Sequence, residues 1–199
     1  MSKLLNVSSS PHVRCGVSTK NLMYDVAIAM LPATIWGVMQ FGIYSLIVVV
    51  ATVLSCVLSE YLFETLMHKP VTISDGSALV TGMILGLNMP PAIPLWMPIL
   101  GGVFAIIVVK QLYGGLGQNW MNPSLAARCF MLISFAQAMT KFTDPVTDAV
   151  ASATPLAAIK AGDTYDLAAM FIGKIPGTIG EVSVIALLIG AASVSYTHL

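Results

Sequence analysis

Charged residues are scarce in this sequence. They make up 9% of its 199 residues, while 57% are hydrophobic; a soluble domain usually carries about 25% charged residues. The scarcity indicates that lipid is the solvent for most of the chain. Nine basic residues balance nine acidic ones, which leaves no case for nucleic-acid binding or for a polybasic lipid-binding surface.

Cysteine is also rare. Cys15, Cys56 and Cys129 are far apart and form no CxxC pair, and the three histidines show no metal-ligand spacing. We therefore expect neither a disulfide framework nor a zinc or iron–sulfur site built by this chain alone. The simplest interpretation is that the cysteines are small buried apolar residues.

Long runs without any charge predict membrane spans. Residues 26–59 and 76–109 each form a charge-free run of 34 residues, which suits two helices of about 20 residues joined by a tight turn. The first pair is expected to turn at Phe41-Gly42 and the second at residues 89–94, MPPAIP. The predicted spans are 22–41, 43–66, 74–89, 95–113, 123–140 and 179 to the end.

The basic residues predict the orientation of these spans. Three of them precede the first span, Lys69 follows the second and Lys110 ends the fourth, while the short turns after the first and third spans carry none. The positive-inside rule therefore puts the N-terminus in the cytoplasm. Residues 141–178 then face outward after five crossings. The first 20 residues lack the apolar core and cleavage site of a signal peptide.

Several predicted spans are short or interrupted. Pro32 lies inside the first, Pro98 and Gly101-Gly102 lie inside the fourth, and the third, 74–89, is short for a span. Such segments are typical of the irregular backbone that lines a buried site in transporter-like folds. They are equally compatible with kinked helices that neighbouring helices tolerate.

A glycine-rich turn leads into the fifth span, in the stretch KQLYGGLGQNWMNPSLAAR. Gly114, Gly115 and Gly117 permit positive φ, and Asn122 is expected to cap a helix whose first residue is Pro123. Free N–H groups at that helix start could hold an anion or a polar ring edge, although a structural turn is the more frequent outcome. The stretch is neither a GxGxxG turn after a strand nor a Walker A loop.

The acidic residues near span ends have ordinary explanations. Ser74 or Asp75 is expected to cap the third span, and a place beside an ion path is the alternative for Asp75. Glu60 and Glu64 lie one turn apart near the inner end of the second span. We expect both to be interfacial and solvated.

The longest polar interval contains residues 148–162, DAVASATPLAAIKAG. Thr154 and Pro155 form an N-cap and N1 pair for a short helix that Gly162 would end. A phosphate esterified to Thr154 would sit at the positive end of that helix. The residues alone favour the plain cap, and attachment remains the alternative.

Six stretches in order resemble those of a known family: SSSPHVR, SDGSALVTG, LNMPP, KQLYGGLGQNWMNP, DAVASATPLA and GEVSVIALLIGA. The chain resembles the membrane subunit shared by the Rnf and Na⁺-pumping NADH:quinone reductase complexes, specifically the D-type subunit of Rnf. The resemblance implies an all-α integral membrane protein. It would be a polytopic helical bundle with about six spans here and broken or short helices, as in urea-transporter-like folds of two inverted halves.

In that family a flavin transferase esterifies FMN to a threonine in an Asp-x-x-Ser/Thr-Gly-Ala-Thr type motif. Asp148, Ser152 and Ala153 precede Thr154 here, so the resemblance implies that Thr154 carries covalent FMN as a phosphoryl threonine. Ala151-Ser152-Ala153 departs from the more frequent Ser-Gly-Ala. The resemblance leaves open a second, non-covalent flavin (riboflavin) at the glycine-rich stretch and the broken helices, and it adds no catalytic residue or metal site.

The resemblance further implies a function. The protein would be a flavoprotein subunit of an ion-translocating ferredoxin:NAD⁺ oxidoreductase in a bacterial or archaeal cell membrane, coupling electron transfer to Na⁺ or H⁺ transport. Its partners would be Rnf subunits of the A, B, C, E and G types, especially the outward-facing flavin subunit, with the flavin transferase and membrane lipid. The alternatives are the B-type subunit of the Na⁺-pumping quinone reductase, a urea-transporter-like channel subunit without a redox role, and a structural subunit without its cofactor.

The expected organisation follows from the spans and the resemblance together. The segments are a cytoplasmic N-terminal segment (1–21), the first five-helix membrane repeat (22–140), an extracytoplasmic flavin-attachment loop (141–178) and the start of a truncated second repeat (179–199). Because the family continues with further helices, we expect the chain to be a fragment whose last residues, SVSYTHL, are a non-native tail.

Overall fold

The computed structural model describes residues 18–143, 150–151, 159–160 and 167–198. Its regular structure is helical except for one short antiparallel pair, β1 (Phe142–Thr143) with β2 (Val150–Ala151). Within these described ranges, three helices are long and apolar enough to cross a membrane, and three shorter ones are also apolar. The chain is therefore a polytopic helical membrane protein, as the sequence predicts.

The long helices begin and end close to the predicted residues. α1 (Thr19–Phe41) and α2 (Ile43–Leu66) are joined at Gly42, whose φ of 81° is the left-handed conformation that glycine adopts readily. The next long helix, Trp96–Tyr113, has three parts that follow one another without a break. They are α4 (Trp96–Val103), η2 (Phe104–Lys110), which has π-helical geometry, and η3 (Gln111–Tyr113).

Shorter helices complete the bundle. α3 (Ser77–Leu87) follows the single turn η1 (Ile73–Asp75), and α5 (Pro123–Ser134) is followed by α6 (Ala136–Met139). α8 (Leu167–Ile172) precedes α9 (Val184–His198). α9 begins at Val184 rather than at the predicted Ile179, because Ile179 and Gly180 bind the end of α3 instead.

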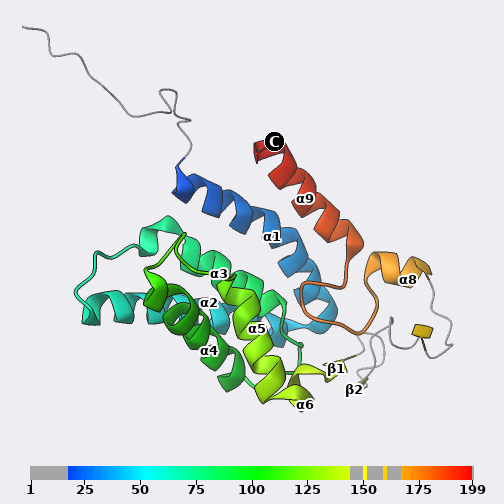
Figure 1. Ribbon diagram of the computed structural model, residues 1–199. Helices are drawn as coiled ribbons and strands as arrows, with labels where there is room; N and C mark the ends of the chain where they lie inside the picture. The colour runs from blue at the N-terminus through cyan, green and yellow to red at the C-terminus, as the bar shows by residue number, and fades with distance from the viewer. Residues whose placement is uncertain (1–17, 144–149, 152–158, 161–166, 199) are drawn as a thin grey trace, which may run out of the picture.

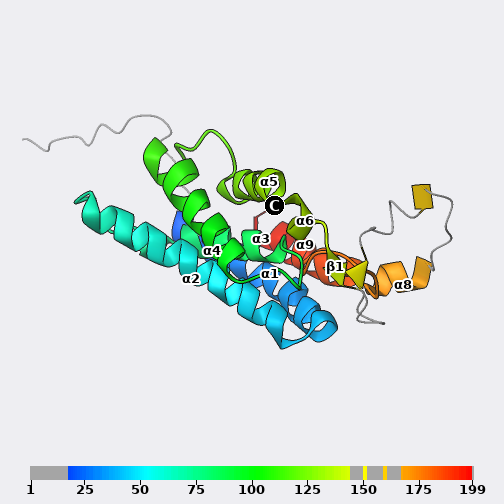
Figure 2. The ribbon, with the colours of Figure 1, turned by 90° about the horizontal axis from the view of Figure 1, so that it is seen from below.

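The helices form two groups in space. α1 and α9 lie side by side and antiparallel, while α2, α3, α4 and α5 pack together beside them (Figure 1). Figure 2 shows the same grouping from below, with β1 and α8 at the end of the molecule where α1 ends and α9 begins. The predicted polar interval is therefore attached at this end.

α2 and α3 pack closely against each other. A Cβ on Gly82 would lie 2.6 Å from the Cα of Val53, and a Cβ on Gly86 would lie 3.0 Å from the Cα of Val49. These two glycines form a GxxxG pair, which lets helix backbones approach closely in membranes. The short α3 is thus held tightly against the long α2.

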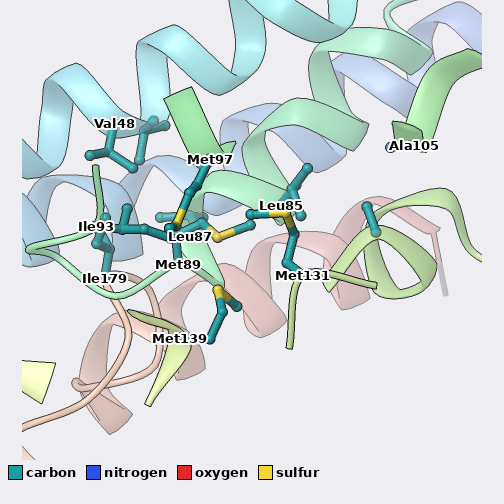
Figure 3. Packing of buried hydrophobic residues seen from close by; sticks show 12 residues of the cluster. Val48, Leu85, Leu87, Met89, Ile93, Met97, Ala105, Met131, Met139 and Ile179 are labelled. Carbon is teal, nitrogen blue, oxygen red and sulfur yellow. The ribbon is translucent and has the colours of Figure 1, made fainter. Parts of the chain in front are cut away.

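The hydrophobic core surrounds the second half of α3. Leu85 and Leu87 are buried among methionine side chains from the segment before α4, from α4 itself and from α5 and α6 (Figure 3). Methionine is unbranched and polarisable, so it fills the irregular gaps that broken helices leave. Ile179, from the segment before α9, completes the cluster.

Candidate functional site

Thr154, the sequence-predicted attachment residue, lies outside the described residues, as do Asp148, Ser152 and Gly162. The structure does describe what flanks it. Phe142 pairs with Ala151, and Thr143 with Val150, so β2, which lies inside the DAVASATPLA stretch and ends three residues before Thr154, is hydrogen-bonded to β1.

The far side of the polar interval is bound to the membrane helices. The Ile179 amide donates to the Met89 carbonyl at 3.1 Å, and the Gly180 amide donates to the Leu87 carbonyl at 2.8 Å. The end of α3 leaves carbonyls without helical partners, and these bonds satisfy two carbonyls there. A side chain at Gly180 has no space, because its Cβ would lie 2.7 Å from that of Leu87.

The glycine-rich turn has the conformation that the sequence predicts. Gly114, Gly115 and Gly117 have φ values of 116°, 98° and 83°. The Asn122 side chain accepts from the Ser124 amide at 3.0 Å and from the Leu125 amide at 3.4 Å, and Pro123 is the first helical residue. The N-cap prediction is therefore confirmed.

A small hollow of about 180 Å³ lies beside this turn. We call it the polar hollow after its six polar lining residues, although most of its surface is apolar. Its wall includes the hydroxyls of α3 and α5, two asparagines of the turn and the end of η2. Ser124 donates to the Thr81 carbonyl at 2.8 Å, which joins α5 to α3 across the hollow. The polar members of the lining are Ser77, Thr81, Lys110, Asn119, Asn122 and Ser124.

A buried ion pair lies next to the hollow. The ammonium of Lys110 donates to Oε1 of Glu60 at 2.6 Å and to Oγ of Ser77 at 2.6 Å. Lys110 is 2% exposed and Glu60 is 0% exposed. Two charges at this burial are held only because each compensates the other. Three helical segments, α2, α3 and η2, therefore meet at one charge pair.

Amide and hydroxyl donors extend this pair into a network. Gln111 donates from Nε2 to Glu60 at 2.8 Å and to Glu64 at 3.3 Å. Glu64, 2% exposed, also accepts from the Thr72 amide at 3.0 Å and from the Thr72 hydroxyl. Oε2 of Glu60 has no partner among the described residues.

The expectation that Glu60 and Glu64 are solvated is therefore wrong. A hydropathy pattern scores each charged residue without its partners. In the structure Lys110 and Gln111, from another helix, donate the hydrogen bonds that allow the two carboxylates to be buried. The signal was present in the sequence. Spans two and four end on the same side of the membrane by parity, so the acids of one and the cation of the other could have been matched.

Two smaller expectations have mixed outcomes. The N-cap residue of α3 is Gly76, not Ser74 or Asp75, but the Asp75 carboxylate accepts from the Ser77 amide at 2.8 Å and from its hydroxyl at 2.6 Å and so satisfies the first amide of the helix. Cys56 is buried as expected, but Cys129 is exposed on α5. That exposure corrects the interpretation of the cysteines as uniformly buried.

The sequence matches the family model described as "NQR2, RnfD, RnfE family" over residues 6–199. The chain belongs to this family. The match covers every element described above, from α1 to the last helix.

Curated relatives support the NQR2, RnfD, RnfE assignment. The chain is 46% identical over 198 residues to the D-type subunit of the Na⁺-translocating ferredoxin:NAD⁺ oxidoreductase complex of Acetobacterium woodii, covering 96% of this chain and 62% of that protein. It is 39% identical over 207 residues to the D-type subunit of the proton-translocating complex of Clostridium ljungdahlii, covering 97% and 62%. The D-type subunit of the ion-translocating oxidoreductase complex of Rhodobacter capsulatus is 30% identical over 226 residues, covering 96% and 63%. The chain thus spans less than two thirds of the length of these relatives.

Proposed function

We propose that this chain is the D-type membrane subunit of an ion-translocating ferredoxin:NAD⁺ oxidoreductase and carries FMN on Thr154. The observation that carries the proposal is the family match over residues 6–199 together with the DAVASATPLA stretch inside it. Two relatives are named for different ions, Na⁺ in one and protons in the other. Family membership therefore leaves the coupling ion of this chain undetermined.

The described residues on either side of Thr154 are held by hydrogen bonds. β2 pairs with β1 and ends three residues before Thr154, and the bonds of Ile179 and Gly180 to the end of α3 hold the chain after the polar interval. Attached FMN would supply one-electron redox chemistry. The chain's own part is to position the attachment residue beside rigid helices. In the orientation that the basic residues predict, this position is outside the cytoplasm.

The polar hollow at the glycine-rich turn is our proposed contact for a second, non-covalent flavin such as riboflavin. Its hydroxyls and asparagines suit the polar edge of a ring, and Lys110 lies in its wall. At about 180 Å³ the hollow takes such an edge rather than a whole flavin. The proposed contact is therefore limited to that edge.

A denaturing gel tests the attachment. The chain is co-expressed with a flavin transferase, and flavin fluorescence is read on the protein band. Thr154→Ala should abolish the fluorescence, while Thr164→Ala, in the same interval but outside the motif, should keep it. A fluorescent Thr154→Ala band would refute attachment at this residue, and a dark wild-type band would favour the channel or structural alternatives. Flavin released by acid from the native protein measures the second, non-covalent flavin separately.

A further inference from the structure

A cavity of about 970 Å³ lies between α1, α9 and the end of α3. Most of its wall is apolar and includes Val26 and Met30 from α1 and Leu187 and Val194 from α9. The two helices run side by side along its length (Figure 1). A cavity of this size and composition suits an apolar or amphipathic ligand.

The polar end of the cavity is built at the end of α3. Arg128, from α5, donates from Nη1 to Oδ1 of Asn88 at 2.7 Å, and Asn88 donates in turn to the Ile84 carbonyl at 2.8 Å. Glu181 also lines the cavity, and its carboxylate accepts from the Thr178 hydroxyl at 2.7 Å. One cation and one anion therefore stand near the end of α3 in an otherwise apolar wall.

The guanidinium of Arg128 has donors to spare. A guanidinium carries five N–H donors, and the bond to Asn88 uses one of them. None of the carboxylates that the structure describes lies within 4.0 Å of the half-buried Arg128. The bond from Arg128 to Asn88 helps to hold the end of α3 in place. The other N–H donors of Arg128 lie at the cavity wall, and an arginine in a membrane span needs an oxygen-rich partner for such donors.

The depth of this polar end suits a lipid headgroup. Gly86 packs against Val49, which is six residues, or about 9 Å, from the first residue of α2. Asn88, two residues further in the same direction, therefore lies about one turn from the first residue of α2. A long arginine side chain at that depth reaches the boundary between hydrocarbon and headgroups.

We propose that this cavity binds one membrane phospholipid, with its phosphate on Arg128 and an acyl chain between α1 and α9. Guanidinium binds phosphate through paired, charge-assisted hydrogen bonds, and the apolar wall accommodates the chain. Glu181 favours a head that also carries an ammonium group, as phosphatidylethanolamine does. This proposal does not depend on the flavin chemistry.

Native mass spectrometry tests the lipid. The protein is purified from its membrane in a mild detergent, with any subunits that accompany it, and then delipidated and given dioleoyl-phosphatidylethanolamine. Wild type should bind one molecule per chain. Arg128→Gln should bind it with a Kd at least about tenfold higher, because the charge-assisted hydrogen bonds to the phosphate are lost. Exposed Lys141→Gln serves as the charge control.

A second pair of variants keeps the test valid if Arg128→Gln fails to fold. Ala191 lines the cavity and its neighbour Ala192 does not, so Ala191→Phe should exclude the lipid while Ala192→Phe should not. Dioleoylglycerol, which lacks the phosphate, should not bind at the cavity, and millimolar inorganic phosphate should not displace the phospholipid. Equal lipid binding by Ala191→Phe and Ala192→Phe overturns the proposal, as does displacement by phosphate alone.

Discussion

Lys110 and Glu60 neutralise each other in a place where neither charge could remain alone. Their atoms lie 2.6 Å apart and both side chains are almost fully buried. Removing one partner of a buried pair leaves an uncompensated charge and costs about 3–5 kcal/mol, whereas replacing both by neutral groups of similar size is often close to neutral. The stability of this end of the bundle therefore depends on the pair as a unit.

Lys110→Met should lower the unfolding free energy by about 3–5 kcal/mol, because it leaves the Glu60 carboxylate buried and unpaired. The double variant Lys110→Met with Glu60→Gln should recover most of that loss, since Gln111 can still donate to the new amide oxygen. Calorimetric melting of the purified protein in detergent measures both effects.

Lys141→Met, at an exposed position, is the control and should change little. If the loss in the double variant equals the sum of the losses of Lys110→Met and Glu60→Gln measured alone, the two residues act independently of each other.

The helix bounds were largely predictable, and the buried network was not. Gly42 and the run from Met89 to Pro94 mark turns by their own conformational limits, so they could be read from the sequence. The burial of Glu64 depends on Thr72 and Gln111, which come from other segments. Single-helix patterns carry no information about such partners.

Two glycines, Gly82 in α3 and Gly101 in α4, show that the sequence also does not reveal how closely whole helices pack. Gly82 and Gly101 both lie inside apolar helices and look alike in the sequence. The structure separates them, because a Cβ at Gly82 would lie 2.6 Å from the backbone of Val53, whereas one at Gly101 would meet only side-chain atoms at 3.4 Å or more.

Gly82→Ala should therefore destabilise the protein by about 1–3 kcal/mol, because α3 must move away from α2 to admit the methyl group. Gly101→Ala is the matched control and should be neutral or more stable by up to about 1 kcal/mol, since alanine favours helix over glycine. Melting temperatures of the two variants measured side by side decide the matter. Equal destabilisation of both would contradict the packing that the structure shows.

The whole molecule has two distinct ends. At one end Lys69 reaches the Gln111 carbonyl at 3.5 Å, and at the other Tyr44 donates to the Ile93 carbonyl at 2.9 Å. The loop after α2 therefore shares an end with the glycine-rich turn. This arrangement agrees with the alternation of spans that underlies the predicted orientation, although the side of the membrane remains a prediction.

Cysteine labelling in intact cells tests that orientation. In a chain whose three native cysteines are replaced by alanine, Lys141→Cys should react with a membrane-impermeant maleimide before the cells are opened. Met67→Cys, in the loop after α2, should react only after permeabilisation, because the basic residues place that loop in the cytoplasm. The reverse pattern would put the N-terminus outside the cytoplasm and the proposed flavin residue, Thr154, inside it.

The predicted attachment residue shows where sequence reasoning goes beyond the structure. Thr154 was identified by the resemblance of its motif, and it lies outside the described residues. Its role stays a prediction that the fluorescence gel decides. The structure contributes the contacts on either side of Thr154: the pair of β1 with β2, which ends three residues before it, and the hydrogen-bonded segment at Ile179 and Gly180.

α3 is a short helix that makes a hydrogen bond to another segment at each of its ends. Its first residue, Ser77, accepts from Lys110, and its last, Leu87, accepts from Gly180. The eleven residues of α3 separate the contact with Gly180 from the buried charges, a length of about 16 Å. A hydrogen bond of 2.6 Å weakens when its atoms separate by a few tenths of an ångström. A small shift of α3 along its axis, caused by a movement at Gly180, would therefore also change the distance between Ser77 and Lys110.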